Sequence, residues 1–124
     1  MWIFLNNAFL SIVKPKDRAS LLVRARAKGD IERVFPEAVV SCTPERDYRF
    51  RALIPRARVA EAITAYVMEM HYPNFKGSVV EHDRHTVCSR VWSTMLGFQD
   101  ARARLEHAPP RGRRQPPRLL DFEG

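Results

Sequence analysis

The sequence predicts a small α+β domain in which an antiparallel sheet packs against helices. The prediction rests on residues 47–76, which contain one strand, one amphipathic helix and an aromatic-rich connection. Residues 47–54 alternate in the way that a half-buried strand does, and from Pro55 onward apolar residues recur at helical spacing. A helix that directly follows a strand has to pack back onto the sheet, and this unit builds α+β folds.

The strand and the helix can be assigned residue by residue. Period-two alternation places four side chains on the face that we expect to be buried: Tyr48, Phe50, Ala52 and Ile54. The opposite face receives Asp47, Arg49, Arg51 and Leu53. Pro55 stops the ladder and can open a helix, because its fixed φ suits the first helical turn. The apolar stripe expected on that helix is Val59, Ala60, Ile63, Tyr66, Val67 and Met70.

A hairpin and a third strand are expected upstream. Residues 2–5 and 8–13 are rich in strand-forming side chains and are separated by Asn6 and Asn7. Asn tolerates positive φ, so this pair predicts a two-residue hairpin turn. Residues 21–26 alternate again, which places Leu21, Val23 and Ala25 on one face and Leu22, Arg24 and Arg26 on the other.

A short helix and a short strand complete the expected sheet. Gly29 and Asp30 predict a turn and an N-cap for a helix whose buried side chains are Ile31, Val34 and Phe35, and Pro36 ends it. A strand over residues 39–42 follows. The order from residue 21 is therefore strand, helix, strand, strand, helix, preceded by a hairpin. This order resembles part of a ferredoxin-like fold with its first strands rearranged.

The remainder of the chain predicts a loop, a third helix and a tail. Residues 71–78 read as a loop, and residues 80–104 as a C-terminal helix. Its expected apolar stripe is Val87, Val91, Met95 and Phe98, widened by Cys88 and Trp92. Residues 107–124 are rich in Pro and Arg, which predicts a disordered basic tail. We therefore expect one domain over residues 1–106 with two packing helices and a C-terminal helix.

Composition favours a folded, strongly basic protein. The chain has 124 residues, of which 45% are hydrophobic, and 21 basic against 14 acidic residues give a net charge of +7. The basic excess is nearly all Arg, which suits bidentate contacts to phosphate and carboxylate and stacks on aromatic rings. This favours nucleic acid or an acidic protein surface as partner. Coding bias would produce the same excess without any functional meaning.

Cysteine usage and the first residues exclude several classes. Two cysteines, Cys42 and Cys88, cannot build a Cys-rich zinc site or frame a disulfide-rich secreted domain. Residues 1–13 are apolar but too short to cross a bilayer, and they lack the layout of a signal peptide. We expect a cytoplasmic protein with no membrane partner.

Four arginines on the predicted sheet form the first candidate site. Arg24, Arg26, Arg49 and Arg51 project from the face opposite the helices, where Trp2 and Phe4 can join them. Lys76, from the aromatic-rich connection, completes the candidate binding set. Arginine and aromatic side chains on an open sheet are how RNA-binding sheets hold bases and phosphates. Two alternatives remain: the third helix covers this face, or the arginines only keep it soluble.

A second candidate groups His82, Asp83, His85 and Cys88, with His71 nearby. These residue types occur in metal sites and in acid–base or thiol chemistry. Their spacing matches no hydrolase, P-loop or Rossmann pattern. We therefore expect structural histidines, a buried thiol, no catalytic residues, no metal site and no cofactor.

Several segments together resemble a family of small bacterial proteins of unassigned function. They are MWIFLN, AFLSIV, LLVRAR, DIERVFP, DYRFRALIP and YPNFK, spread over roughly residues 1–96. The resemblance implies no catalytic residue. Proteins of this size and makeup also occur among phage and mobile-element inhibitors, including anti-CRISPR proteins.

These observations predict a non-enzymatic binding protein that docks on nucleic acid or on a nucleoprotein complex. The alternative is a mobile-element inhibitor, of anti-CRISPR type, that binds an acidic surface of a host protein. A small metal-dependent hydrolase or nuclease is the third possibility. Mimicry of DNA is disfavoured, because imitating phosphate requires acidic residues and this chain is basic.

Overall fold

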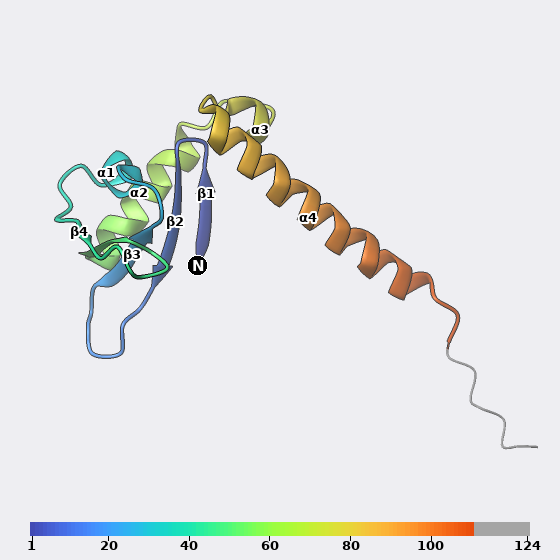
Figure 1. Ribbon diagram of the computed structural model, residues 1–124, viewed down its shortest axis with the longest axis horizontal. Coiled ribbons are helices and arrows are strands. Elements are labelled where there is room, and N and C mark those ends of the chain that lie inside the picture. The colour runs from blue at the N-terminus through green and yellow to red at the C-terminus, as the bar shows by residue number, and fades with distance from the viewer. Residues whose placement is uncertain (111–124) are drawn as a thin grey trace, which may run out of the picture. The chain divides into compact units, whose positions relative to one another are not determined.

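The computed structural model describes residues 1–110 (Figure 1). The described residues divide into two units, residues 1–88 and residues 89–110, and each is described by itself. The predicted domain boundary after residue 106 stays a prediction. The predicted disordered tail lies, from residue 111, outside the described residues.

The first unit is built on a five-stranded sheet in the order β1-β2-β3-β5-β4, with every neighbouring pair antiparallel. The strands are β1 Trp2–Leu5, β2 Ala8–Val13, β3 Leu21–Ala25, β4 Ser41–Cys42 and β5 Phe50–Ile54. The helices of this sheet are α1 Asp30–Val34 and α2 Arg56–Met68. The predicted α+β class with an antiparallel sheet is confirmed. The strand expected over residues 39–42 is shorter than predicted, because β4 contains only Ser41 and Cys42.

The strand order explains how the ferredoxin-like part is rearranged. β3, α1 and β4 form a split β-α-β unit, because β5 lies between the two strands that α1 connects. The other side of β3 is occupied by β2, which comes from the upstream hairpin. In a β-α-β-β-α-β chain this position beside the first strand is taken by the last strand, which follows the second helix. Here β2, from the upstream hairpin, takes that position.

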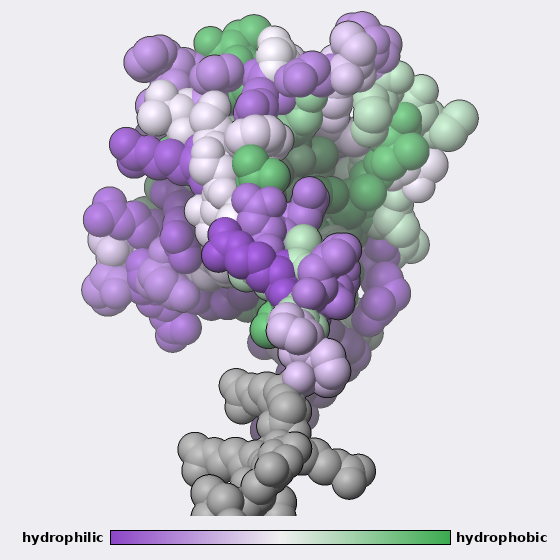
Figure 2. Space-filling model, turned by 90° about the vertical axis from the view of Figure 1, so that its right-hand side faces the viewer, coloured by the Kyte–Doolittle hydropathy of each residue, from purple (hydrophilic) through white to green (hydrophobic). Residues whose placement is uncertain are grey.

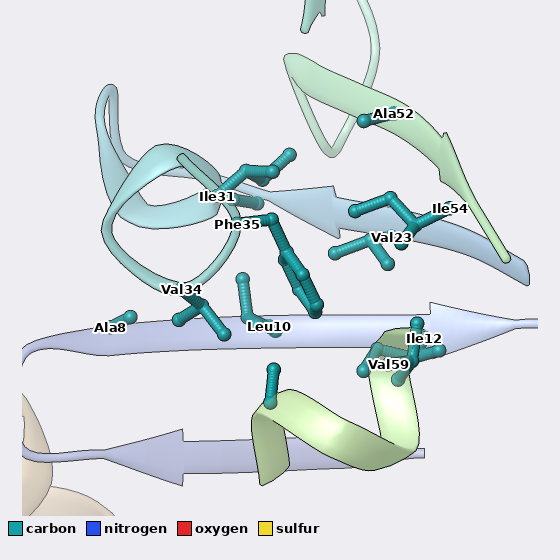
Figure 3. Packing of buried hydrophobic residues seen from close by; sticks show 12 residues of the cluster. Ala8, Leu10, Ile12, Val23, Ile31, Val34, Phe35, Ala52, Ile54 and Val59 are labelled. Atoms are coloured by element: carbon teal, nitrogen blue, oxygen red, sulfur yellow. The ribbon is translucent and has the colours of Figure 1, made fainter. Parts of the chain in front are cut away.

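The hydrophobic core lies between one face of the sheet and helices α1 and α2 (Figure 3). The strands contribute Ala8, Leu10, Ile12, Val23, Ala25, Ala52 and Ile54. The helical side contributes Ile31, Val34, Phe35, Val59 and Ala62. Phe35, which follows the last residue of α1, projects into the middle of this cluster and is fully buried. Each large apolar side chain buried in this way stabilises the fold by roughly 1.5–3 kcal/mol.

The start of α1 differs from the prediction. Its N-cap is Gly29, with φ 92°, and no side chain caps the helix. Glycine suits this position because it adopts positive φ without a steric penalty. Asp30 is the first helical residue and is 1% exposed, so its carboxylate serves contacts other than capping. The predicted buried side chains Ile31 and Val34 are confirmed.

The buried stripe of α2 is narrower than predicted. Val59 and Ala62 are buried, and Ile63 and Tyr66 pack partly against the core. Ala60, Val67 and Met70 were expected in this stripe, and all three are exposed instead. The prediction was right for Val59, Ile63 and Tyr66 and wrong for the other three. Ala60 follows Val59 by one residue and so lies about 100° around the helix from it, Val67 is in the last turn of α2, and Met70 lies beyond its end.

Two further helices follow. The expected loop over residues 71–78 contains a short helix, α3 Phe75–Ser78, whose N-cap Asn74 accepts a hydrogen bond from the Gly77 amide at 2.9 Å. The helix α4 runs over His82–His107, longer than the predicted 80–104. Cys88 is its only buried residue, whereas Val87, Trp92, Met95 and Phe98 are each more than half exposed. None of the helices in residues 1–110 has the length and apolarity to cross a membrane.

Candidate nucleic-acid interface

One row of side chains crosses all five strands on the face opposite the core. Trp2 of β1 pairs with Ser11 of β2, Ser11 with Arg24 of β3, and Arg24 with Arg51 of β5. Ser41 of β4 closes the row beside Arg51. Residues directly opposite one another in an antiparallel sheet point to the same face. The row therefore brings the predicted residues Trp2, Arg24 and Arg51 together.

Tyr48 organises the basic part of this face. The guanidinium carbons of Arg24 and Arg26 lie 4.5 Å and 4.6 Å from the centroid of the Tyr48 ring, a cation–π geometry. The ring is 4% exposed but does not belong to the core cluster. The predicted burial of Tyr48 is confirmed, but its ring contacts the arginines of the opposite face and not the core cluster that contains Ala52. β5 begins only at Phe50, so the alternation of the strand does not extend back to Tyr48.

The remaining contacts of Arg24 and Arg51 are mostly with neutral groups. Arg24 donates from a terminal guanidinium nitrogen to the Ser11 hydroxyl at 2.7 Å, and its Nε is buried without a hydrogen-bond partner among the described residues. Arg51 donates from Nε to the Tyr48 carbonyl at 3.2 Å. Its one ion pair, with the exposed carboxylate of Asp47, spans 3.7 Å. The charge on this face is thus weakly compensated.

An aromatic cluster lies on the same face, toward β1. Phe4 stacks on Phe9 with ring centroids 4.5 Å apart, and Trp2 meets Phe9 edge-on at 5.9 Å. The Trp2 ring is 67% exposed. The sequence prediction included Trp2 and Phe4 but missed Phe9, although alternation along residues 8–13 places Phe9 on the same side as Ser11. We call the aromatic cluster together with Arg24, Arg26, Arg51 and Tyr48 the sheet-face site.

Two of the predicted binding residues are less well placed. Arg49 is exposed and precedes the first residue of β5, so the strand register does not fix the side to which it points. Lys76 lies on α3, outside the sheet. Arg26 follows the last residue of β3 but joins the sheet-face site through its contact with Tyr48.

The second candidate site does not assemble. His82, Asp83 and His85 are exposed on the first turns of α4. Within residues 1–110, no three His, Cys, Asp or Glu side chains lie close enough together to hold a metal ion. Cys88 is buried, and this burial raises the pKa of its thiol against a smaller opposing effect of the Arg84 charge.

A second group of arginines surrounds the buried carboxylate of Asp30. Arg84 donates to both carboxylate oxygens, at 2.7 Å and 3.1 Å, and Arg33 donates to one of them at 3.0 Å. The Phe9 amide donates to the same carboxylate at 3.0 Å. Glu81 adds a second carboxylate, 3.2 Å from Arg84 and 3.6 Å from Arg33. We call Arg33 and Arg84 the Asp30-bound arginines; the sequence prediction did not include them.

Comparison of this chain with family models, with curated proteins and with solved structures finds no match.

The surface is mixed in character: Figure 2 shows hydrophobic side chains gathered beside hydrophilic ones on one face of the molecule.

Proposed function

We propose that the protein is a non-enzymatic binding protein that holds nucleic acid on its sheet-face site. The observation that carries the proposal is the uneven compensation of charge. Arg24 and Arg26 form no ion pair within residues 1–110, and the carboxylate nearest Arg51 is exposed and 3.7 Å away. Guanidinium groups that are stacked on a ring and lack a fixed carboxylate remain available to bind phosphate.

The aromatic cluster favours single-stranded nucleic acid over duplex. The exposed Trp2 ring and the Phe4–Phe9 stack offer flat apolar surfaces, and bases can stack on them only when they are not already stacked in a helix. The row from Trp2 through Ser11 to Arg24 and Arg51 runs perpendicular to the strands. A single strand along this row would place bases on the aromatic side and phosphates on the arginine side.

The proposal is tested by fluorescence anisotropy with labelled single strands of about 12 nucleotides, within the range that sheet-based sites accommodate. The double variant Arg26→Gln with Arg51→Gln is compared with a control of equal charge, Arg18→Gln with Arg56→Gln, whose residues are exposed outside the site. Each lost phosphate contact lowers the salt slope of binding by about one unit. We expect weaker binding and a lower slope in the first variant only.

Two outcomes would contradict the proposal. If both double variants weaken binding equally, the protein attracts nucleic acid only through its net charge. If the wild-type protein binds no single strand at low salt, the sheet-face site has another partner. An acidic protein surface is the partner with matching charge, and it would be sought with a polyglutamate peptide as the probe.

A further inference from the structure

The strand β1 lies at an edge of the sheet, and its unpaired backbone groups can be identified from the register. Met1 and Ile12 exchange two hydrogen bonds: the amino terminus of Met1 donates to the Ile12 carbonyl at 2.7 Å, and the Ile12 amide donates to the Met1 carbonyl at 2.8 Å. Hydrogen-bonded and non-bonded pairs alternate along an antiparallel ladder. Ile3 and Leu5 therefore point their backbone groups toward β2, and Trp2 and Phe4 point theirs away from the sheet.

The two edges of the sheet differ in how they are protected. β4, at the other edge, has only two residues, and a turn with Pro44 and the charged residues 45–47 follows it. Short length, proline and charge are common devices against unwanted strand pairing. β1 has the sequence Trp-Ile-Phe-Leu, with no charge, proline or glycine. It is therefore an unprotected edge.

Both faces of β1 offer apolar surface to an incoming strand. Trp2 and Phe4 flank the edge on the sheet-face side, and Trp2 is largely exposed. On the other side a pocket of about 310 Å³ lies between β1 and the end of α2. Its apolar lining includes Ile3, Leu5, Ile63, Tyr66, Val67 and Met70. The partner strand that fits must be uncharged and apolar on both faces.

We propose that β1 pairs antiparallel with β1 of a second copy of this chain, which joins the two sheets into one. The two-fold axis passes between the Ile3 residues of the two copies, which lie opposite each other. Trp2 of each copy then lies opposite Phe4 of the other. These are the residues whose backbone groups point away from the sheet and have no backbone partner within residues 1–110, so each of the two pairs can exchange both of its N–H···O bonds. Each copy also sets its Trp2 ring beside the Phe4 ring of the other, which continues the aromatic cluster across the junction.

A second copy fits this edge better than a charged peptide does. β1 itself has the required pattern, apolar on both faces and uncharged over its four residues. Two copies, each with a net charge of +7, repel each other, and this repulsion is smallest where few charged side chains meet, as along β1. An acidic peptide would instead be drawn to the arginines of the sheet-face site. Because the pairing uses backbone groups in the plane of the sheet, it leaves both sheet-face sites open.

The experiment separates backbone pairing from other association by two substitutions of one residue. Phe4→Pro removes the outward N–H that the proposed pairing needs, and proline is tolerated on an edge strand where the N–H faces solvent. Phe4→Ala removes the same ring but keeps the N–H, so it is the matched control. Sedimentation velocity on the full chain, from low to high micromolar concentration, should show a dimer for the wild type and for Phe4→Ala, and a monomer for Phe4→Pro.

A second measurement on the wild type does not depend on the folding of a variant. Amide exchange followed by NMR should slow at Trp2 and Phe4 as the protein concentration rises, and stay constant at Ile3 and Leu5, which are bonded to β2 at every concentration. A wild type that is monomeric throughout would overturn the proposal. Equal dimerisation of the two Phe4 variants, or exchange at Trp2 and Phe4 that is independent of concentration, would also overturn it, because the copies would then meet elsewhere.

Discussion

The molecule holds two groups of arginines that the sequence alone cannot distinguish and that the structure treats in opposite ways. The Asp30-bound arginines, Arg33 and Arg84, meet a carboxylate that is 1% exposed. Arg24 and Arg26 of the sheet-face site meet the neutral ring of Tyr48. Within residues 1–110 the first group is paired with fixed carboxylates, whereas Arg24 and Arg26 form no ion pair.

This difference shows that the position of a carboxylate, rather than the number of arginines, decides how much of the arginine charge is compensated within the described residues. A buried carboxylate is costly to desolvate, and it is retained only where fixed donors surround it. Arg84 and Asp30 therefore form a fixed ion pair. Tyr48 and Ser11 position Arg24 without neutralising it. Substitutions in the two groups should therefore differ in their effects on stability and binding.

The largest effect is expected from Asp30→Ala. It removes the buried carboxylate that pairs with the Arg84 guanidinium, which is 13% exposed. It also removes the acceptor of the Phe9 amide. Breaking a buried ion pair by removing one partner costs about 3–5 kcal/mol. Urea unfolding should show this loss, whereas Asp100→Ala, at an exposed position of α4, should change stability by less than about 0.5 kcal/mol. A loss below about 1 kcal/mol for Asp30→Ala would show that Arg84 is not fixed by the carboxylate.

The next effect concerns Tyr48, on which the second group depends. Tyr48→Leu removes the ring from two guanidinium groups, and each cation–π contact is worth roughly 0.5–2 kcal/mol. Tyr48→Phe keeps the ring and removes only the hydroxyl. We expect the leucine variant to lose about 1–3 kcal/mol of unfolding free energy and to weaken single-strand binding, and the phenylalanine variant to change neither. Equal losses in the two variants would assign the role to the hydroxyl.

A smaller, selective effect is expected from Trp2→Ala. Stacking of a base on an aromatic ring contributes about 1–3 kcal/mol to binding, and Trp2 is mostly exposed, so its removal should lower affinity for single strands with little change in unfolding free energy. Binding of duplex by the same variant should be unaltered. If duplex binding falls by the same factor, Trp2 acts by shaping the surface and does not stack on bases.

The smallest effect concerns thiol reactivity. Burial raises the pKa of Cys88, so less thiolate is present near neutral pH and alkylation should be slower there than at the exposed Cys42. The raised folded-state pKa also adds stability that is present below the unfolded value of about 8.5 and is lost as pH rises above it. Asp30→Asn leaves the Arg84 charge compensated by Glu81 alone, which should lower the pKa of Cys88 and speed its alkylation. Mass spectrometry of iodoacetamide-treated protein at several pH values measures both rates.

Sequence periodicity predicted the local elements well and their partners poorly. The hairpin around Asn6 and Asn7 and the alternation in β3 and β5 depend on neighbouring residues, and both are present. Asp30 was interpreted as a helix cap, because the partner that explains its burial, Arg84, lies 54 residues away. No local pattern encodes such a contact.

Periodicity also predicts burial only when another surface is present to cover the stripe. Met95 and Phe98 follow helical spacing as strictly as Val59 and Ile63 do, yet they are exposed. For the candidate site, the alternation correctly placed Arg24, Arg51, Trp2 and Phe4 on one face. It assigned Tyr48 to the wrong face, because the strand starts two residues later than the alternation suggests.

The order of the first three strands has a consequence for how the chain folds during its synthesis. β1, β2 and β3 pair in the order in which they leave the ribosome, and the turn between β1 and β2 is only two residues long. Short connections close with little entropic cost, so this meander can assemble early at translation rates of about 5–20 residues per second. Until β5 arrives, the open edge is then β3, whose residues Leu21 and Val23 still lack their partners. We expect this transient strand edge, which is absent from the folded protein, to be where chaperones bind the nascent chain.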